Sequence, residues 1–116
     1  MKRLLIVDDD ARFRELARML LERTPEFDVV GEAGDGSTAI EASRELEPDV
    51  VLLDVNLPDG LGFDLVPRLT EQGEPNVVMI SSRDDGGYAR LAEDVGAAGF
   101  LSKHDFTAAA ITQIVG

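Results

Sequence analysis

Four places in the sequence carry side chains that could do phosphate chemistry together. Each place follows a short apolar run directly or within two residues, and the polar residues there are three aspartates at 8–10, then Asp54, Ser81 and Lys103. Carboxylates held close together repel one another, so one of them takes up a proton unless a cation is present. Proteins hold magnesium, a hard cation, with one or two carboxylates, a phosphate and water. If the four places meet, one carboxylate could attack phosphorus while the lysine and the serine hydroxyl stabilise the phosphoryl oxygens.

Five short apolar runs have the character of buried strands. They are Leu4–Val7, Val29–Ala33, Val50–Leu53, Val77–Ile80 and Gly99–Leu101. The third run is apolar at every position, which is typical of a central strand that is covered on both faces. Four of the five runs lead directly, or within two residues, into the polar places described above. The runs therefore predict how those places could be brought together.

The stretches between the runs have helical spacing. Apolar residues within 13–21 follow the i, i+3, i+4, i+7 pattern of a helix that is buried on one face. Asp10 can cap this helix. Pro67 would remove a hydrogen bond from the third helix unless that helix starts late, near Phe63 or Asp64. We expect the remaining helices near 39–46, 65–69, 88–95 (ended by Gly96) and 105–115 (capped by an aspartate or a threonine).

The strict alternation of strands and helices predicts the fold class. Five βα units favour an α/β domain with an open, doubly wound parallel sheet and helices on both faces, and the runs are too few for an eight-unit barrel. The 116 residues suit one domain. In such sheets, ligands bind beyond the carboxyl ends of the strands, where the polar places lie.

Composition limits the partners of the chain. Its 23 acidic and 11 basic residues give a formal net charge of −12, so we expect no direct nucleic-acid binding and no binding to anionic membranes. No apolar run is long enough to span a bilayer, and the run after Met1-Lys2-Arg3 is too short for a signal peptide. The absence of cysteine fits a reducing compartment, and we expect a cytoplasmic protein.

Four segments of the chain resemble bacterial response-regulator receiver domains in residue type, order and separation. They are Leu4–Asp10, Asp54–Gly60, Met79–Ser82 and Gly96–Lys103, and the resemblance covers essentially the whole chain. It implies a flavodoxin-like (βα)5 fold with strand order 2-1-3-4-5. Most receivers have a proline after the lysine, whereas His104 stands here. This departure, with Gly31-Glu32-Ala33, resembles the subgroup that carries a C-terminal LuxR-like helix-turn-helix domain. One interpretation of the chain is therefore a fragment of a longer protein.

The resemblance implies a role for each site residue. Asp54 is expected to accept the phosphoryl group and to share in binding Mg²⁺. Asp9 would ligate the ion directly, Asp8 mainly through water, and the backbone carbonyl of Asn56 would be a third protein ligand.

Three further residues complete the expected site. The hydroxyl of Ser81 and the ammonium of Lys103 would each contact a phosphoryl oxygen. Phe100 stands at the position of the aromatic residue that turns inward on activation, although its residue type alone fits a core position equally well.

The implied function is a phosphorylation-activated signalling switch of a two-component system. A sensor histidine kinase would phosphorylate Asp54, and the surface of the fourth helix, fifth strand and fifth helix would change its preference for an output domain or partner, with transcription as the output and a homodimer as one activated form. Such a domain assists its own phosphoryl transfer but is not expected to be an enzyme.

Two alternatives remain open from the residues. Asp8-Asp9-Asp10 fits the Asp-x-Asp motif of haloacid-dehalogenase-like phosphatases, although this leaves Asp54 without a role. The second alternative is a receiver-like binding module that works without phosphorylation. Such modules usually lack an acidic residue, the acceptor or the lysine, and all of these are present here.

Overall fold

The central sheet has five parallel strands. The computed structural model of the chain describes residues 1–71, 73–83 and 86–116. The strands lie in the spatial order β2-β1-β3-β6-β7 and are β1 (Lys2–Val7), β2 (Phe27–Ala33), β3 (Val50–Asp54), β6 (Asn76–Ser81) and β7 (Gly99–Ser102). Numbered along the chain within this sheet, the order is 2-1-3-4-5, which confirms the predicted flavodoxin-like topology. All five predicted strands are present.

Five helices connect and cover the strands. They are α1 (Ala11–Glu22), α2 (Gly36–Leu46), α3 (Gly62–Thr70), α4 (Tyr88–Asp94) and α5 (Ala108–Val115). The side chain of Asp10 accepts a hydrogen bond from the backbone N–H of Arg12, which confirms the predicted cap of α1. Gly96, with a φ of +88°, follows the end of α4 as predicted.

Two predicted helix starts were wrong. The fifth helix was expected from about Asp105, but Lys103–Asp105 form a 3₁₀ turn because the Ser102 side chain accepts a hydrogen bond from the N–H of His104. The α-helix starts at Ala108, where Thr107 caps it. The third helix starts at Gly62, not as late as Phe63 or Asp64, and it contains Pro67. Pro67 therefore leaves one helix hydrogen bond unmade, as the sequence predicts for a helix without a late start.

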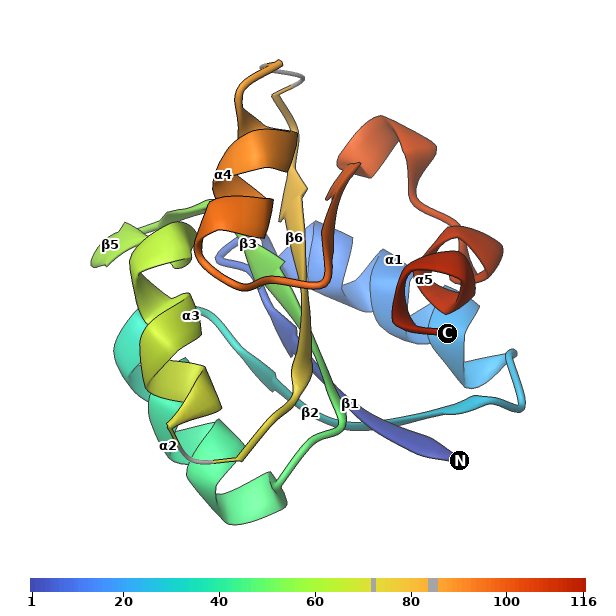
Figure 1. Cartoon of the computed structure of the whole chain (residues 1–116). Coiled ribbons are helices and arrows are strands. Elements are labelled where there is room, and N and C mark those ends of the chain that lie inside the picture. Colours follow the sequence, from blue (N-terminus) through green and yellow to red (C-terminus); the bar gives the residue numbers. More distant parts are fainter. Residues whose placement is uncertain (72, 84–85) are drawn as a thin grey trace.

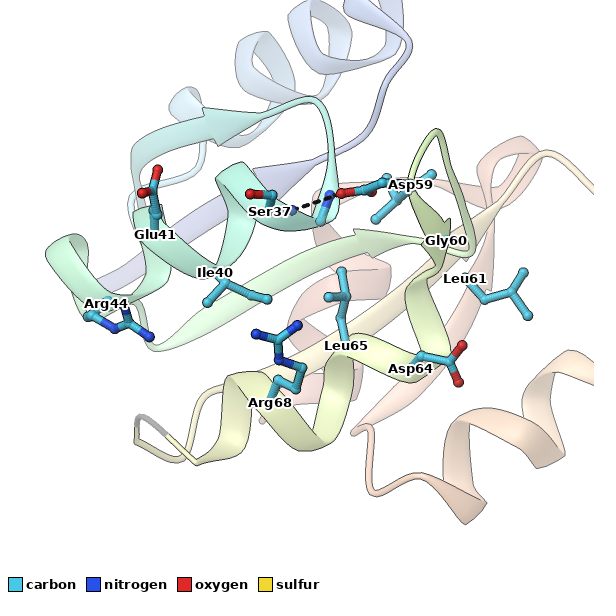
Figure 2. A pocket seen from close by; sticks show the side chains of 12 residues that line it. Ser37, Ile40, Glu41, Arg44, Asp59, Gly60, Leu61, Asp64, Leu65 and Arg68 are labelled. Atoms are coloured by element: carbon cyan, nitrogen blue, oxygen red, sulfur yellow. Dashed lines mark hydrogen bonds between the residues drawn. The ribbon is translucent and has the colours of Figure 1, made fainter.

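A short hairpin after β3 was not predicted. Its strands β4 (Asn56–Leu57) and β5 (Gly60–Leu61) pair in antiparallel fashion. At its tip, the carboxylate of Asp59 accepts hydrogen bonds from the N–H groups of Gly36 and Ser37 at the start of α2 (Figure 2). These bonds satisfy helix N–H groups that have no partner within the helix, and they fasten the hairpin to α2.

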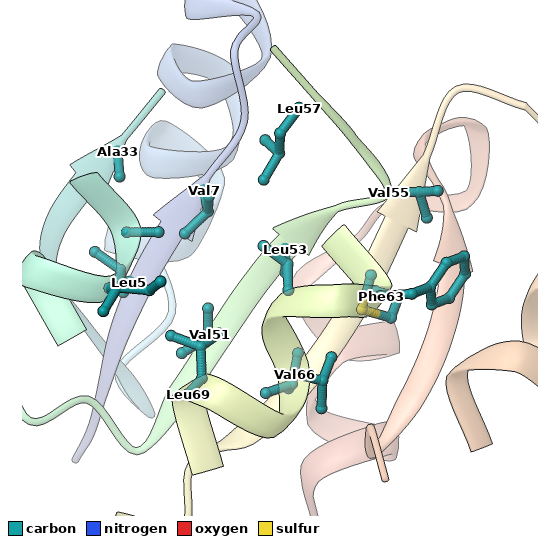
Figure 3. Packing of buried hydrophobic residues seen from close by; sticks show 14 of the residues in the cluster. Leu5, Val7, Ala33, Val51, Leu53, Val55, Leu57, Phe63, Val66 and Leu69 are labelled. Carbon is teal, nitrogen blue, oxygen red and sulfur yellow. The ribbon is translucent and has the colours of Figure 1, made fainter. Parts of the chain in front are cut away.

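The helices cover the sheet in two layers, with α1 and α5 on one face and α2, α3 and α4 on the other (Figure 1). Alternate strand residues point into different cores. Leu53 packs with Phe63 and Val66 of α3 (Figure 3), whereas Leu52 belongs to the cluster of α1 and α5. Residues 4–7 of β1 and 50–53 of β3 are apolar and fully buried. Burial of each such side chain contributes roughly 1.5–3 kcal/mol to the stability of the fold.

No helix in the described part of the chain is long and apolar enough to cross a lipid bilayer.

Candidate phosphoryl-transfer site

Strand register brings the four polar places to one edge of the sheet. Val7 pairs with Leu53, so Asp8 and Asp54 follow neighbouring strand positions. Asp54 itself pairs with Ile80, the residue before Ser81. Ser81 in turn pairs with Ser102, the residue before Lys103. The carboxyl ends of four parallel strands thus deliver the predicted residues side by side, as the topology of an open α/β sheet requires.

Three of the predicted acidic residues form a tight cluster. Each of Asp8, Asp9 and Asp54 offers a carboxylate oxygen within 4.8 Å of the other two. Asp8 is fully buried and Asp54 is 5% exposed, whereas Asp9 is open to solvent. Oδ1 of Asp8 accepts a hydrogen bond from the N–H of Asp10 (2.8 Å), and Oδ1 of Asp54 accepts a longer one from Asn56 (3.4 Å). Two buried carboxylates therefore lie close together with few hydrogen-bond donors around them.

Lys103 places a positive charge beside this cluster. Its Nζ lies 2.5 Å from Oδ2 of Asp8 and 3.9 Å from Oδ2 of Asp54. Although the ion pair with Asp8 is close, Asp8 Oδ2 is buried and accepts no well-aligned hydrogen bond from any described residue. One ammonium cannot balance three carboxylates. The charge deficit, the oxygen donors and this unsatisfied buried oxygen all fit a hard divalent cation.

The electrostatics of Asp54 lead to the same conclusion. Burial, and next the negative charge of Asp8, raise the pKa of Asp54 to about 7, while Lys103 and the N–H of Asn56 act in the opposite direction. Without a cation, Asp54 would hold a proton for much of the time near neutral pH. A protonated carboxyl is a poor nucleophile, so bound positive charge would favour its reactive form.

Two residues that the sequence reasoning missed fix the backbone of the cluster. Gly62 lies so close to Asp54 that a Cβ at residue 62 would overlap the Asp54 carbonyl oxygen. Only glycine fits here. At the end of β1, the carbonyl oxygen of Asp8 accepts a hydrogen bond from Nη1 of Arg14 in α1 (2.6 Å). Nε of Arg14 also pairs with Glu32 of β2 (3.0 Å). Neither role has a sequence signal, because each depends on how the chain folds back on itself in three dimensions.

Ser81 lies at the end of β6 and is fully buried. Its Oγ accepts a hydrogen bond from the N–H of Arg83 (3.0 Å). Its position beyond the Asp54–Ile80 pair agrees with the predicted place of the hydroxyl. Its contact with a phosphoryl oxygen remains a prediction, as does metal ligation by the carbonyl of Asn56.

Phe100 is half-buried within a row of three aromatic rings. Its ring meets Tyr88 edge to face at a centroid distance of 5.7 Å, and Tyr88 meets Phe63 in the same way at 5.5 Å. The row links β7 to α4 and α3. The sequence reasoning named Phe100 but missed its two partners, which lie 12 and 37 residues away.

A pocket lies between α2 and α3 (Figure 2). It has a volume of about 430 Å³, and Ile40, Leu57 and Leu65 are among the residues that line it. None of the predicted site residues lines it. The acidic cluster and this pocket are therefore lined by different residues.

Comparisons with known proteins agree with this geometry. The sequence model of the response regulator receiver domain matches residues 4–115. The transcriptional regulatory protein DegU of Brevibacillus brevis is 35% identical over 101 residues, which are 86% of this chain and 43% of DegU. A protein-glutamate methylesterase/protein-glutamine glutaminase of Carboxydothermus hydrogenoformans is 35% identical over 107 residues, 90% of this chain and 30% of that protein. The chain spans less than half the length of these curated relatives.

A solved structure shows the same architecture. The two-component response regulator of the LuxR family from Aurantimonas sp. SI85-9A1 superimposes with a TM-score of 0.90 at 31% sequence identity. The match covers 99% of this chain and 85% of that one. This similarity agrees with the predicted LuxR-like subgroup.

Proposed function

Because this chain belongs to the response regulator receiver domain family, we propose that it is a switch that a sensor histidine kinase activates by phosphorylating Asp54. The observation that carries the proposal is the buried Asp54 carboxylate at the end of β3, which lies with Asp8 and Asp9 within 4.8 Å and 3.9 Å from Lys103. A nucleophile, metal ligands and a phosphoryl-binding cation are then present together.

The proposed step transfers one phosphoryl group. A carboxylate oxygen of Asp54 forms a bond to phosphorus, the phosphorus–nitrogen bond of the donor phosphohistidine breaks, and its electron pair leaves with the imidazole nitrogen. Lys103 and the hydroxyl of Ser81 each stabilise an equatorial oxygen of the group in transfer. The product is an aspartyl phosphate, which water later hydrolyses.

Asp8, Asp9, Asp54 and the backbone carbonyl of Asn56 would hold a Mg²⁺ ion at this edge. Bound there, the ion would offset the negative charge of the carboxylates and of the incoming phosphoryl oxygens. The unsatisfied Oδ2 of Asp8 and the raised pKa of Asp54 both support this assignment.

The output is proposed to pass through the surface of α4, β7 and α5. In the aromatic row, Phe100 of β7 contacts Tyr88 of α4, so a movement of Phe100 would change the contact between β7 and α4. DegU is a transcriptional regulatory protein and the Carboxydothermus relative is a methylesterase. We favour a cytoplasmic, non-enzymatic receiver that controls a transcriptional output domain or partner, with dimerisation on activation.

The arrangement favours Asp54 over Asp8 as the nucleophile. A phosphatase of the haloacid-dehalogenase type would attack with Asp8, whose carboxylate is fully buried and pairs with Lys103 at 2.5 Å. We therefore propose no phosphatase activity.

Incubation with a small phosphodonor such as phosphoramidate, with and without Mg²⁺, tests the function. We expect the intact protein to gain the mass of one phosphoryl group in the presence of Mg²⁺. Asp54→Ala should abolish this gain, and Asp28→Ala, on the exposed part of β2, should leave it unchanged. A gain that survives in Asp54→Ala would contradict the site, and no gain in the parent protein would contradict the function.

A further inference from the structure

We propose that Phe13 is a positioning residue for Lys103, whose ammonium it holds against its ring face next to the acidic cluster. Nζ of Lys103 lies 4.5 Å from the centroid of the Phe13 ring, within the range of a cation–π interaction. The inference rests on the proposed function only in that Lys103 is taken to bind the phosphoryl group. The contact between Phe13 and Lys103 does not depend on that function.

The setting makes this contact effective. The side chain of Lys103 is 15% exposed and Phe13 is 8% exposed, so little water remains to hydrate the ammonium. Cation–π attraction is strongest when the cation is desolvated. The ring therefore replaces part of the hydration that Lys103 gives up at this site.

The ring is itself held in place. Phe106 meets Phe13 edge to face at a centroid distance of 5.4 Å and an angle of 68°. Phe106 also donates its backbone N–H to the carbonyl oxygen of Lys103 (3.4 Å). The residue that orients the ring is thus tied to the backbone of the lysine that the ring holds. Lys103 and Phe13 cannot shift far apart without breaking this arrangement.

A ring face suits the two positions that Lys103 must occupy. At rest, its Nζ is 2.5 Å from Asp8 but 3.9 Å from Asp54. When a phosphoryl group is attached to Asp54, the ammonium has to move toward that group and away from Asp8. The face of an aromatic ring attracts a cation without fixing it by a directional hydrogen bond. Phe13 can therefore keep Lys103 in the site during this shift, whereas a carboxylate would compete for the ammonium.

The experiment varies the charge of the Phe13 ring face and then removes the ring. Phe13 is replaced by mono-, di- and trifluorinated phenylalanine, which progressively weaken the negative face of the ring, and by leucine, which removes it. Phe27→Leu is the matched control, because Phe27 is a 4% exposed ring in the same core cluster and forms no part of the site. The probes are beryllium fluoride, a phosphoryl mimic, and phosphoramidate, both with Mg²⁺.

We expect affinity for beryllium fluoride and the phosphorylation rate to fall stepwise with fluorine number, reaching about 3- to 10-fold in Phe13→Leu. Phe27→Leu should change either value by less than about twofold, even if its stability drops. Equal values across the fluorinated series would overturn the inference, and this series remains informative if Phe13→Leu does not fold.

A second readout separates this inference from the proposed function. In proton NMR spectra without any phosphodonor, the Lys103 ε-CH₂ signals should lie upfield because of the Phe13 ring current, and Phe13→Leu should remove this shift. A normal Lys103 shift in the parent protein would overturn the inference whether or not Asp54 accepts a phosphoryl group. Failed uptake with an intact upfield shift would instead overturn only the function.

Discussion

The edge of the sheet that carries the acidic cluster has two halves that differ in packing. The inner half consists of β1 and β3, where residues 4–7 and 50–53 are fully buried and Gly62 abuts the Asp54 carbonyl. The outer half consists of α4 and β7. Gly99, Phe100 and Leu101 of β7 are only half-buried, and of the seven residues in α4, all of them described, Ala92 alone is buried.

This difference has a physical consequence. Closely packed interiors resist small displacements, whereas segments with few buried apolar contacts open or shift at low free-energy cost. The inner half therefore keeps Asp8 and Asp54, the proposed metal ligand and the proposed nucleophile, in place. The outer half is the part that we expect to respond to phosphorylation, and it carries Phe100, the residue with the proposed switch role.

Two crowded glycines provide the most direct way to break this comparison. Gly62→Ala forces a Cβ against the backbone of Asp54, which cannot yield, and we expect a loss of about 2–4 kcal/mol in the free energy of unfolding. Gly99→Ala brings a Cβ to 2.9 Å from Cγ2 of Ile114, a side chain that can rotate away, so we expect about 1 kcal/mol or less. Urea denaturation measures both. Equal losses would contradict the assignment of the two halves.

The pH dependence of stability sharpens the account of the inner half. In the unfolded chain the Asp54 carboxyl has its ordinary pKa of 3.8, whereas burial and the charge of Asp8 raise this pKa to about 7 in the folded, cation-free protein. Folding thus becomes less favourable as the pH rises through this window. Asp54→Asn removes the effect, so the variant should be about 1–3 kcal/mol more stable than the parent above pH 7, with no such gain near pH 4.

Thermal or urea unfolding from pH 4 to 8 in the presence of a chelator measures this effect. Asp28→Asn, an exposed position on β2, is the control and should follow the parent curve. Addition of Mg²⁺ at pH 7.5 should stabilise the parent more than Asp54→Asn. Parallel stability curves for the parent and Asp54→Asn across the whole pH range would contradict the raised pKa of Asp54.

The smallest expected effect concerns the aromatic row of the outer half. Tyr88→Leu removes the ring between Phe63 and Phe100 and should cost about 1 kcal/mol of stability. Tyr88→Phe keeps the ring and should stay within about 0.5 kcal/mol of the parent. Hydrogen exchange should become faster in α4 and β7 of Tyr88→Leu but not in β1 and β3. Faster exchange spread evenly over the sheet would contradict separate halves.

Much of the fold and of the acidic cluster could be predicted from the sequence. Buried parallel strands give continuous apolar runs, and polar residues such as Asp54 that follow such runs must gather at one edge. The local signal of Asp10 was sufficient to predict a helix cap. These features depend on neighbouring residues and on general topology, which a single sequence contains.

The features that were missed leave no periodic or capping pattern in the sequence. The hairpin β4–β5 has strands of two residues each, too short for any periodic pattern. Phe13 matches the apolar stripe of α1, so its contact with Lys103 cannot be distinguished from ordinary core packing. The overlap that requires glycine at residue 62 arises only when the hairpin folds back on β3.

The alternation of β3 between two cores limits how a change at Asp54 can spread. Leu52 packs toward α1 and α5, and Leu53 packs toward α2, α3 and α4. If β3 slid along its axis by one residue, every side chain would exchange one core for the other. Strand β3 therefore resists movement along its own axis. We expect a structural change at Asp54 to pass instead across the strand ends, from β3 to β6 and β7, in the order in which the strands lie in the sheet.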